Sequence, residues 1–137
     1  MEPSLKSEIT LIGKKAKLAS YDLALLSDKN KNDALKESAK NIDDKTQEIL
    51  EANEIDVSLA KEKNLNDALI DRLILNEERI KSISNGILQI AELENPVGKI
   101  LSSWSRPNGL SIEKVSVPLG VIGVIYESRP NVSADAA

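Results

Sequence analysis

Apolar side chains recur at helical spacing through the first 95 residues of the chain. Between residues 5 and 26 they are separated alternately by four and three positions, which places them in one stripe along about six turns of helix. Ser4 can cap the start of this helix, and Ser27-Asp28 ends the pattern and can cap the next helix. The stripe consists of Leu5, Ile9, Ile12, Ala16, Ala19, Leu23 and Leu26.

Two more helical patterns follow before residue 64. The second helix begins after Asp28 and fades by Asn53, and Thr46 interrupts its apolar face. A shorter helix is predicted from Asp56 to about Lys63. The interruption weakens any interpretation of the second helix as part of a coiled coil.

Two further helices are predicted between residues 64 and 95. The turn Asn64–Asp67 precedes a helix whose apolar face ends at Leu73. Asn76 can cap the last helix, which ends near Leu93. Gly86 lies inside that helix, where it costs about 1 kcal/mol relative to alanine and would allow another backbone to approach closely.

Proline and glycine become frequent after residue 95, which is typical of loops and strands. On this pattern residues 95–109 form a connection. Residues 110–117 then alternate with mixed faces, as at the edge of a sheet. Leu119–Tyr126 is apolar at odd and even positions alike, which is typical of a central parallel strand covered by helices on both sides.

A buried parallel strand needs neighbours, and no second strand of this kind is found in the 137 residues. A helix is predicted to begin just after Pro130, close to the end of the sequence. We therefore expect the amino-terminal piece of a larger α/β protein. The alternative is a small helical protein with one hydrophobic hairpin.

Composition narrows the chemistry further. With 18 basic and 22 acidic residues the net charge is −4, which gives no general electrostatic attraction for nucleic acid. The chain has no cysteine and no histidine, so disulfides, thiolate catalysis and the commonest metal ligands are excluded for these residues. It has neither a secretory signal pattern nor an apolar run long enough for a bilayer, so we expect no membrane contact and a cytoplasmic location.

The densest polar cluster follows the predicted buried strand, where open α/β sheets bind their ligands. Its side chains are the carboxylate of Glu127, the hydroxyl of Ser128, the guanidinium of Arg129 and the amide of Asn131. Arg129 can bind a carboxylate or phosphate, and Asn131 could donate to a developing oxyanion. In the alternative interpretation, Arg129 pairs with Glu127, Ser128 caps the helix and Asn131 bonds the backbone.

The segment VPLGVIGVIYESRPNVSADAA (Val117–Ala137) closely resembles γ-glutamyl phosphate reductase, also called glutamate-5-semialdehyde dehydrogenase. That family belongs to the aldehyde dehydrogenase superfamily, and the YESRPNV core is highly specific. The resemblance covers nearly the whole chain and corresponds to the amino-terminal part of such an enzyme. Upstream segments similar to the family include Ala16 and Ala19, residues 27–30, Asp71–Ile80, Asn95–Gly98, and Trp104 before Arg106–Leu110.

The resemblance implies an enzyme of proline biosynthesis that reduces γ-glutamyl phosphate to glutamate-5-semialdehyde with NADPH. In that family a cysteine thiolate displaces phosphate to form a thioacyl enzyme, and hydride transfer then releases the aldehyde. Because the present chain lacks cysteine, we expect it to be inactive alone. The resemblance also implies a homo-oligomer at full length and a functional coupling to glutamate 5-kinase.

The resemblance further implies an α/β fold of the aldehyde dehydrogenase type, divided into three parts. Residues 1–98 would be the helical portion of the NADP-binding domain. Residues 99–118 would be strands of an oligomerisation arm. Residues 119–137 would be the first buried strand, the active-site turn and the start of the next helix.

Site residues are carried over only onto the polar turn. Tyr126, Glu127 and Ser128 are predicted to bind the cofactor and Arg129 the substrate. In the wider superfamily an asparagine of this turn helps to hold the oxyanion. Alignment on the strand puts Arg129 near that position, whereas chemistry favours Asn131, and we predict Asn131. No metal site is predicted.

A second hypothesis is a helical interaction module without catalytic activity. The apolar stripe over residues 5–26 could pair with a partner helix, as in a coiled coil. The interruption at Thr46 and the strand pattern after residue 109 argue against it.

Overall fold

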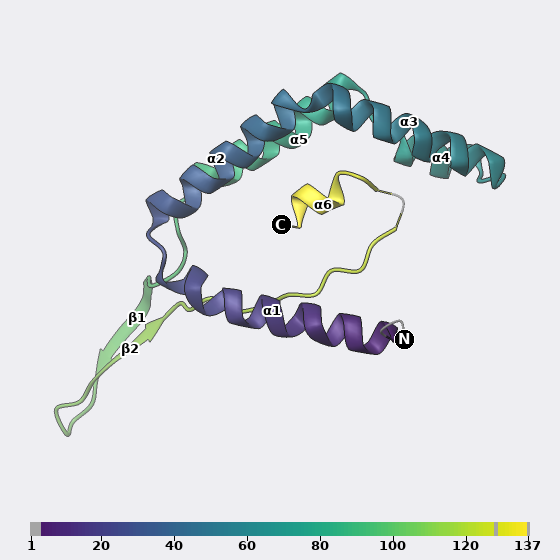
Figure 1. The fold of residues 1–137 in the computed structure, drawn as a ribbon. Helices are drawn as coiled ribbons and strands as arrows, with labels where there is room; N and C mark the ends of the chain where they lie inside the picture. The colour runs from purple at the N-terminus through teal and green to yellow at the C-terminus, as the bar shows by residue number, and fades with distance from the viewer. Residues whose placement is uncertain (1–3, 128, 137) are drawn as a thin grey trace. The chain divides into compact units, whose positions relative to one another are not determined.

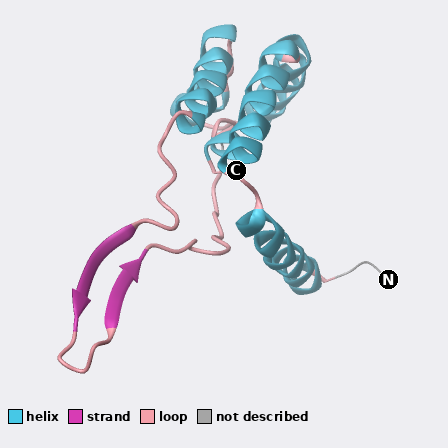
Figure 2. Cartoon of the chain, turned by 90° about the vertical axis from the view of Figure 1, so that its left-hand side faces the viewer, coloured by secondary structure: helices cyan, strands magenta, loops and turns pink. Residues whose placement is uncertain are grey.

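The computed structural model describes residues 4–127 and 129–136. They form two compact units (Figures 1 and 2). The first contains the residues up to 28 together with residues 94–123. The second contains residues 29–93 and those from 124 onward.

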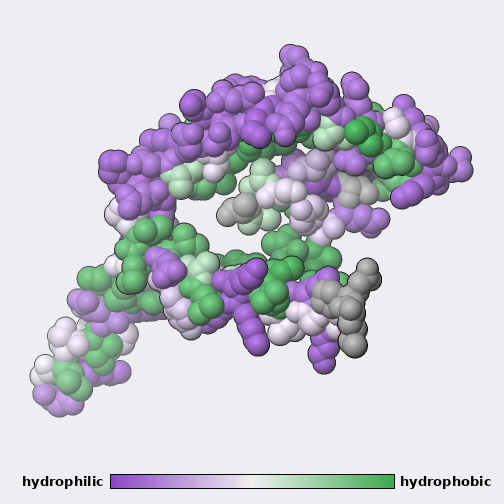
Figure 3. Space-filling model, viewed as in Figure 1, coloured by the Kyte–Doolittle hydropathy of each residue, from purple (hydrophilic) through white to green (hydrophobic). Residues whose placement is uncertain are grey.

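The first helix, α1, extends over Leu5–Leu25 as the apolar stripe predicts. The Ser4 hydroxyl oxygen accepts the Ser7 amide N–H at 3.4 Å, which confirms the predicted cap. No residue of α1 is buried, and Leu5 and Ile12 are 74% and 62% exposed. The apolar residues of this helix therefore lie on the surface and not in a core (Figure 3).

The predicted boundaries of the next two helices are wrong. Helix α2 spans Asp28–Asp44 and α3 spans Thr46–Glu62, so the break falls at Lys45 and not near Asn53. At the break the Thr46 hydroxyl donates to the Asp43 carbonyl at 2.8 Å. Such local side-chain bonds compete with the regular backbone pattern of a helix. Thr46, which interrupts the predicted apolar face, thus also lies at the break between α2 and α3.

The following two helices agree with the sequence. Helix α4 spans Asp67–Leu73 and α5 spans Glu77–Ala91. The side-chain oxygen of Asn66 caps α4 and that of Asn76 caps α5, each accepting the amide N–H three residues later, at 2.9 and 2.7 Å. These short-range bonds explain why both starts are visible in the sequence.

The core of the second unit is small and centred on α5. A Cβ at Gly86 would meet nothing within 4 Å among the described residues, so the close backbone approach predicted there is not observed. The buried residues described in this unit are Ala39, Asn53, Ala60, Ile80, Ser84, Ile87 and Ala91.

Asp43 joins α2 to α5. Its carboxylate accepts the Lys81 ammonium at 2.7 Å and the hydroxyl of fully buried Ser84 at 2.6 Å. These bonds, that from Lys81 first, hold the pKa of the Asp43 carboxyl below its ordinary value, while partial desolvation opposes them. The role of this acid is therefore structural.

Residues 99–118 contain an antiparallel hairpin, with β1 at Ile100–Ser105 and β2 at Ser111–Val115. Both strands lie in the segment where the resemblance implies strands, and β2 lies within the strand pattern of residues 110–117. The connection predicted over 95–109 is wrong, because it contains β1. Every residue of β1 is exposed, so no alternation of apolar and polar positions marks it as a strand. The two strands are paired through Trp104 opposite Ile112.

Leu119–Tyr126 was expected to be a buried parallel strand, and the structure corrects this. The segment has no regular secondary structure and pairs with no other segment of the described residues. Its side chains are exposed, from 45% at Val121 to fully exposed at Ile125. A strand exists only through hydrogen bonds to a neighbour, and the hairpin β1–β2 does not extend to this segment.

The predicted final helix is present as α6, a single turn at Val132–Asp135. Across the described ranges, every helix is too short or too polar to span a lipid bilayer.

Candidate functional site

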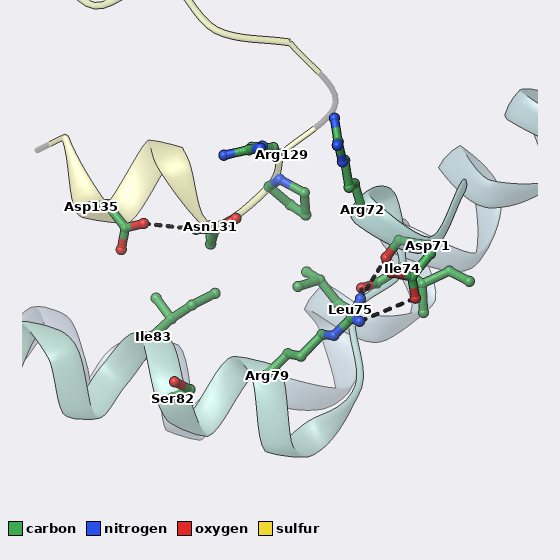
Figure 4. A pocket seen from close by; sticks show the side chains of 11 residues that line it. Asp71, Arg72, Ile74, Leu75, Arg79, Ser82, Ile83, Arg129, Asn131 and Asp135 are labelled. Carbon is green, nitrogen blue, oxygen red and sulfur yellow. Dashed lines mark hydrogen bonds and ion pairs between the residues drawn. The ribbon is translucent and has the colours of Figure 1, made fainter. Parts of the chain in front are cut away.

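A pocket of about 440 Å³ lies within the second unit (Figure 4). One wall comes from α4, the start of α5 and the connection between them. The other comes from the segment before α6 and from α6 itself. The lining residues are Asp71, Arg72, Ile74, Leu75, Arg79, Ser82, Ile83, Arg129, Pro130, Asn131 and Asp135.

Arg79 holds the first wall of this pocket in shape. Its guanidinium donates to the carbonyl oxygens of Asp71 and Ile74, both at 2.6 Å, and pairs with the Asp71 carboxylate at 3.2 Å. The carbonyl groups at the end of α4 are satisfied in this way. Arg79 and Asp71 form an exposed ion pair in this wall, in which their charges offset each other.

Asn53 fixes the same connection from the side of α3. Its amide N–H donates to the Leu73 carbonyl at 2.9 Å, and its oxygen accepts the Leu75 amide at 2.7 Å. The residue is 6% exposed, so water does not compete for these bonds. Held by Asn53 and Arg79, the connection gives the pocket a fixed wall.

Two arginine side chains of the pocket carry no intramolecular hydrogen bond or ion pair with any residue the structure describes. Arg72 extends from α4, and Arg129 extends from the segment before α6 (Figure 4). Both are exposed. Because a guanidinium stays charged at all ordinary pH values, the pocket presents two available cations.

Asp135 supplies an opposite charge on the second wall. Its carboxylate accepts the Asn131 side-chain amide at 2.7 Å, a bond between residues one turn apart. Asn131 is half-buried in the pocket, and Asp135 is exposed. The pocket therefore contains groups that can bind both an anion and a cation.

The structure divides the residues predicted from the sequence. Arg129 and Asn131 line the pocket, whereas Tyr126 and Glu127 lie outside it. The Tyr126 hydroxyl lies 2.7 Å from that of Ser133, and Glu127 is exposed. Ser128 is outside the described residues.

Two contacts of the alternative interpretation of the polar turn are not formed among the described residues. No ion pair between Arg129 and Glu127 is found in the described residues, and Asn131 bonds a side chain, not the backbone. The cap proposed for Ser128 falls outside them.

Sequence reasoning missed the other wall. From the sequence, Asp71, Arg72 and Arg79 belong only to a segment similar to the family, and no role follows for them. Asp135 was not singled out either, although its four-residue spacing from Asn131 places the two on one helix face. Their part in the pocket depends on α5 lying against α6, which begins 41 positions after α5 ends.

No parallel sheet is found among the described residues. Dinucleotide cofactors bind beyond the carboxyl ends of parallel strands, and the one sheet of the described residues is the antiparallel pair β1–β2. Tyr126 and Glu127 are exposed and do not line this pocket. No group of three acidic side chains that could hold a metal ion is found in the described ranges either.

No protein-family model matches the chain. Individual proteins, however, do match it. The chain is 49% identical over all 137 residues to a γ-glutamyl phosphate reductase of Syntrophomonas wolfei, and it covers 33% of that protein. It is 50% identical over 131 residues to a γ-glutamyl phosphate reductase of Bacillus anthracis, covering 32% of it.

Solved structures with the same name are also similar. The Thermotoga maritima γ-glutamyl phosphate reductase matches 90% of this chain with 43% identity and a TM-score of 0.85. The Saccharomyces cerevisiae γ-glutamyl phosphate reductase matches 98% with 34% identity and a TM-score of 0.87. The chain is related to the amino-terminal part of γ-glutamyl phosphate reductases.

This relationship confirms the resemblance drawn from the sequence. The chain spans about a third of the length of the curated γ-glutamyl phosphate reductases that it matches. Its helices and antiparallel hairpin match the amino-terminal part of the solved γ-glutamyl phosphate reductase structures, so the predicted fold class holds in broad terms.

Proposed function

We propose that this chain supplies the amino-terminal part of a cytoplasmic NADPH-dependent enzyme of proline biosynthesis, which reduces γ-glutamyl phosphate to glutamate-5-semialdehyde. In the net reaction a hydride and a proton are consumed, the acyl–phosphate bond is broken, and phosphate is released. The observation that carries the proposal is 49% identity to a γ-glutamyl phosphate reductase along all 137 residues.

The chain alone is expected to have no activity. The acyl transfer proposed for this family needs a cysteine thiolate, and these 137 residues contain no cysteine. The described residues also lack a parallel sheet on which to bind the nicotinamide cofactor. The proposed contribution of this part is therefore substrate contact from the polar turn and the pocket beside it.

A chimera tests the proposal. The chain would be joined to the remaining two thirds of the Syntrophomonas wolfei protein and assayed for phosphate-dependent reduction of NADP⁺ by glutamate-5-semialdehyde, the reverse reaction. Activity is expected in the chimera and none in the chain alone. The matched control is the same two thirds of the protein without this chain. A folded but inactive chimera would contradict the proposal.

Asn131 is proposed to donate its amide N–H to the oxyanion formed during acyl transfer. In the active chimera, Asn131→Ala should then lower kcat by about 100-fold or more and leave the KM for NADP⁺ nearly unchanged. Asn85→Ala, at an exposed position of α5, is the control. An unchanged kcat would remove Asn131 from the mechanism.

The proposed partners are a second copy of the full enzyme and glutamate 5-kinase. The exposed hairpin β1–β2 supports the first, because unpaired strand edges readily pair with another chain. Sedimentation of the chimera should show an oligomer, and a monomer would count against this role of the hairpin.

The exposed apolar face of α1 favours one other candidate, a helical interaction module. Sedimentation of residues 1–95 alone discriminates between the two, because a stable helical dimer would support the module. If the chimera is active and residues 1–95 are monomeric, the reductase hypothesis is supported and the interaction module is excluded.

A further inference from the structure

We infer that the pocket between α4–α5 and α6 binds the α-amino-acid end of the substrate, with its carboxylate on Arg72 and Arg129 and its ammonium on Asp135. The inference rests on the proposed function, since γ-glutamyl phosphate carries both groups on one carbon. It assigns a role in substrate binding to Arg72 and Asp135, although neither belongs to the polar cluster predicted from the sequence.

The charges of the pocket support this assignment. Arg79 and Asp71 pair with each other at 3.2 Å. The other charged groups that line the pocket are the guanidinium groups of Arg72 and Arg129 and the carboxylate of Asp135. An arginine binds a carboxylate through two parallel N–H donors. A ligand with one carboxylate and one ammonium on the same carbon complements such a mixed set.

The pocket is also suitably built for a small ligand. Its volume of about 440 Å³ falls within the range of small-molecule sites. Asn53 and Arg79 hold the connection beneath Arg72 with five hydrogen bonds. The base of the Arg72 side chain is therefore positioned before a ligand arrives, which lowers the entropy cost of binding.

A phosphate or a dinucleotide fits the same residues less well. Neither carries an ammonium group to match Asp135, whose carboxylate would repel an anion that brings no positive charge of its own. The site is thus predicted to discriminate on the presence of an ammonium group, which a simple anion site would not do.

The test measures binding of three small molecules to the 137-residue chain by saturation-transfer NMR. L-Glutamate has both groups of the amino-acid end, glutarate lacks the ammonium, and 4-aminobutyrate lacks the α-carboxylate. Glutamate is expected to bind more tightly than either of the others. Arg72→Gln and Arg129→Gln should each weaken glutamate about tenfold or more. Asp135→Asn should weaken glutamate and leave glutarate unchanged.

The control variant is Arg106→Gln, in the turn of the hairpin, which should bind glutamate like the unaltered chain. Arg129→Lys keeps the charge without the two-pronged geometry and should bind with intermediate affinity. If a glutamine variant loses helical circular dichroism, its lysine counterpart replaces it in the comparison.

Three outcomes would overturn the inference. They are no saturable binding of glutamate, glutamate binding that neither arginine variant changes, and inorganic phosphate binding as tightly as glutamate with no effect of Asp135→Asn. The last outcome would leave a general anion site. Binding is measured on the chain alone, whereas the proposed function is tested on the chimera. Failure of the binding test can therefore be distinguished from failure of the proposed function.

Discussion

Asn53 shows how much a single side chain can fix at the residue scale. It lies in the middle of α3 and bonds both ends of the α4–α5 connection, through the Leu73 carbonyl and the Leu75 amide. Its placement inside a helix explains why the apolar pattern fades there without the helix ending.

Replacing Asn53 should destabilise the second unit. Asn53→Ala leaves two backbone groups without partners in a buried place, which costs about 1–3 kcal/mol. Urea unfolding of the chain in dilute solution, followed by circular dichroism, measures the loss. Asn85→Ala, at an exposed position of α5, is the control and should change the free energy of unfolding very little. Equal stability of the two variants would show that the Asn53 bonds contribute nothing.

Asp43 should make the free energy of unfolding depend on pH. Its pKa in the folded chain is lowered by the bonds from Lys81 and Ser84, from the ordinary 3.8 that holds on unfolding. The stabilisation is therefore present above about pH 4 and is lost as the pH falls through the lower folded value.

Asp43→Asn should accordingly be less stable than the unaltered chain near neutral pH, with a difference that shrinks as the pH falls below 4. Unfolding at a series of pH values measures it. Asp44→Asn is the matched control, since Asp44 makes only a 3.9 Å ion pair with Lys40. A difference between Asp43→Asn and the unaltered chain that stays constant across this range would argue against the assigned bonds.

At the scale of the elements, two glycines serve opposite purposes. Gly109 closes the turn of the hairpin with a φ of 86°, and its amide donates to the Arg106 carbonyl at 2.9 Å. Gly86 lies in α5 with ordinary helical geometry and open space around it. Only the first needs to be glycine within the described residues.

Alanine substitutions should separate the two cases. Gly109→Ala should cost about 1–2 kcal/mol in the hairpin, because a side chain is strained at positive φ. Gly86→Ala should instead stabilise α5 by up to about 1 kcal/mol. Amide hydrogen exchange, read separately for the hairpin and for α5, measures both. Destabilisation by Gly86→Ala only in the chimera would reveal the close backbone approach predicted from the sequence.

For the whole molecule, the described surface carries too much apolar area for an isolated chain. Leu119, Ile122 and Ile125 are between 66% and 101% exposed, and α1 has no buried residue. Large exposed apolar surfaces favour association with another surface or aggregation. The chain spans about a third of the length of the curated relatives that it matches.

We predict that the 137-residue chain self-associates in solution while its helices persist. Leu119→Lys combined with Ile125→Lys should reduce self-association without reducing helical circular dichroism, since neither residue lies in a helix. Sedimentation at several concentrations measures the effect. Val57→Lys, at a half-buried position of α3, should not reduce association. A monomer with a sharp cooperative melt would contradict the prediction.

The sequence alone determined the features that depend on near neighbours. The starts of α1, α4 and α5 are visible because Ser4, Asn66 and Asn76 bond amides three residues away. The family resemblance is equally local, since the YESRPNV segment is continuous. Both kinds of signal are carried by residues a few positions apart, where spacing alone fixes the geometry.

Only the tertiary structure decided what depends on distant partners. It placed Arg129 and Asn131 against α4 and α5, it gave Asn53 partners 20 and 22 positions away, and it left Leu119–Tyr126 without a neighbouring strand. The physical reason is common to all three. A pocket, a buried polar bond and a strand each need a second segment, and the spacing within one segment carries no information about which other segment will lie beside it.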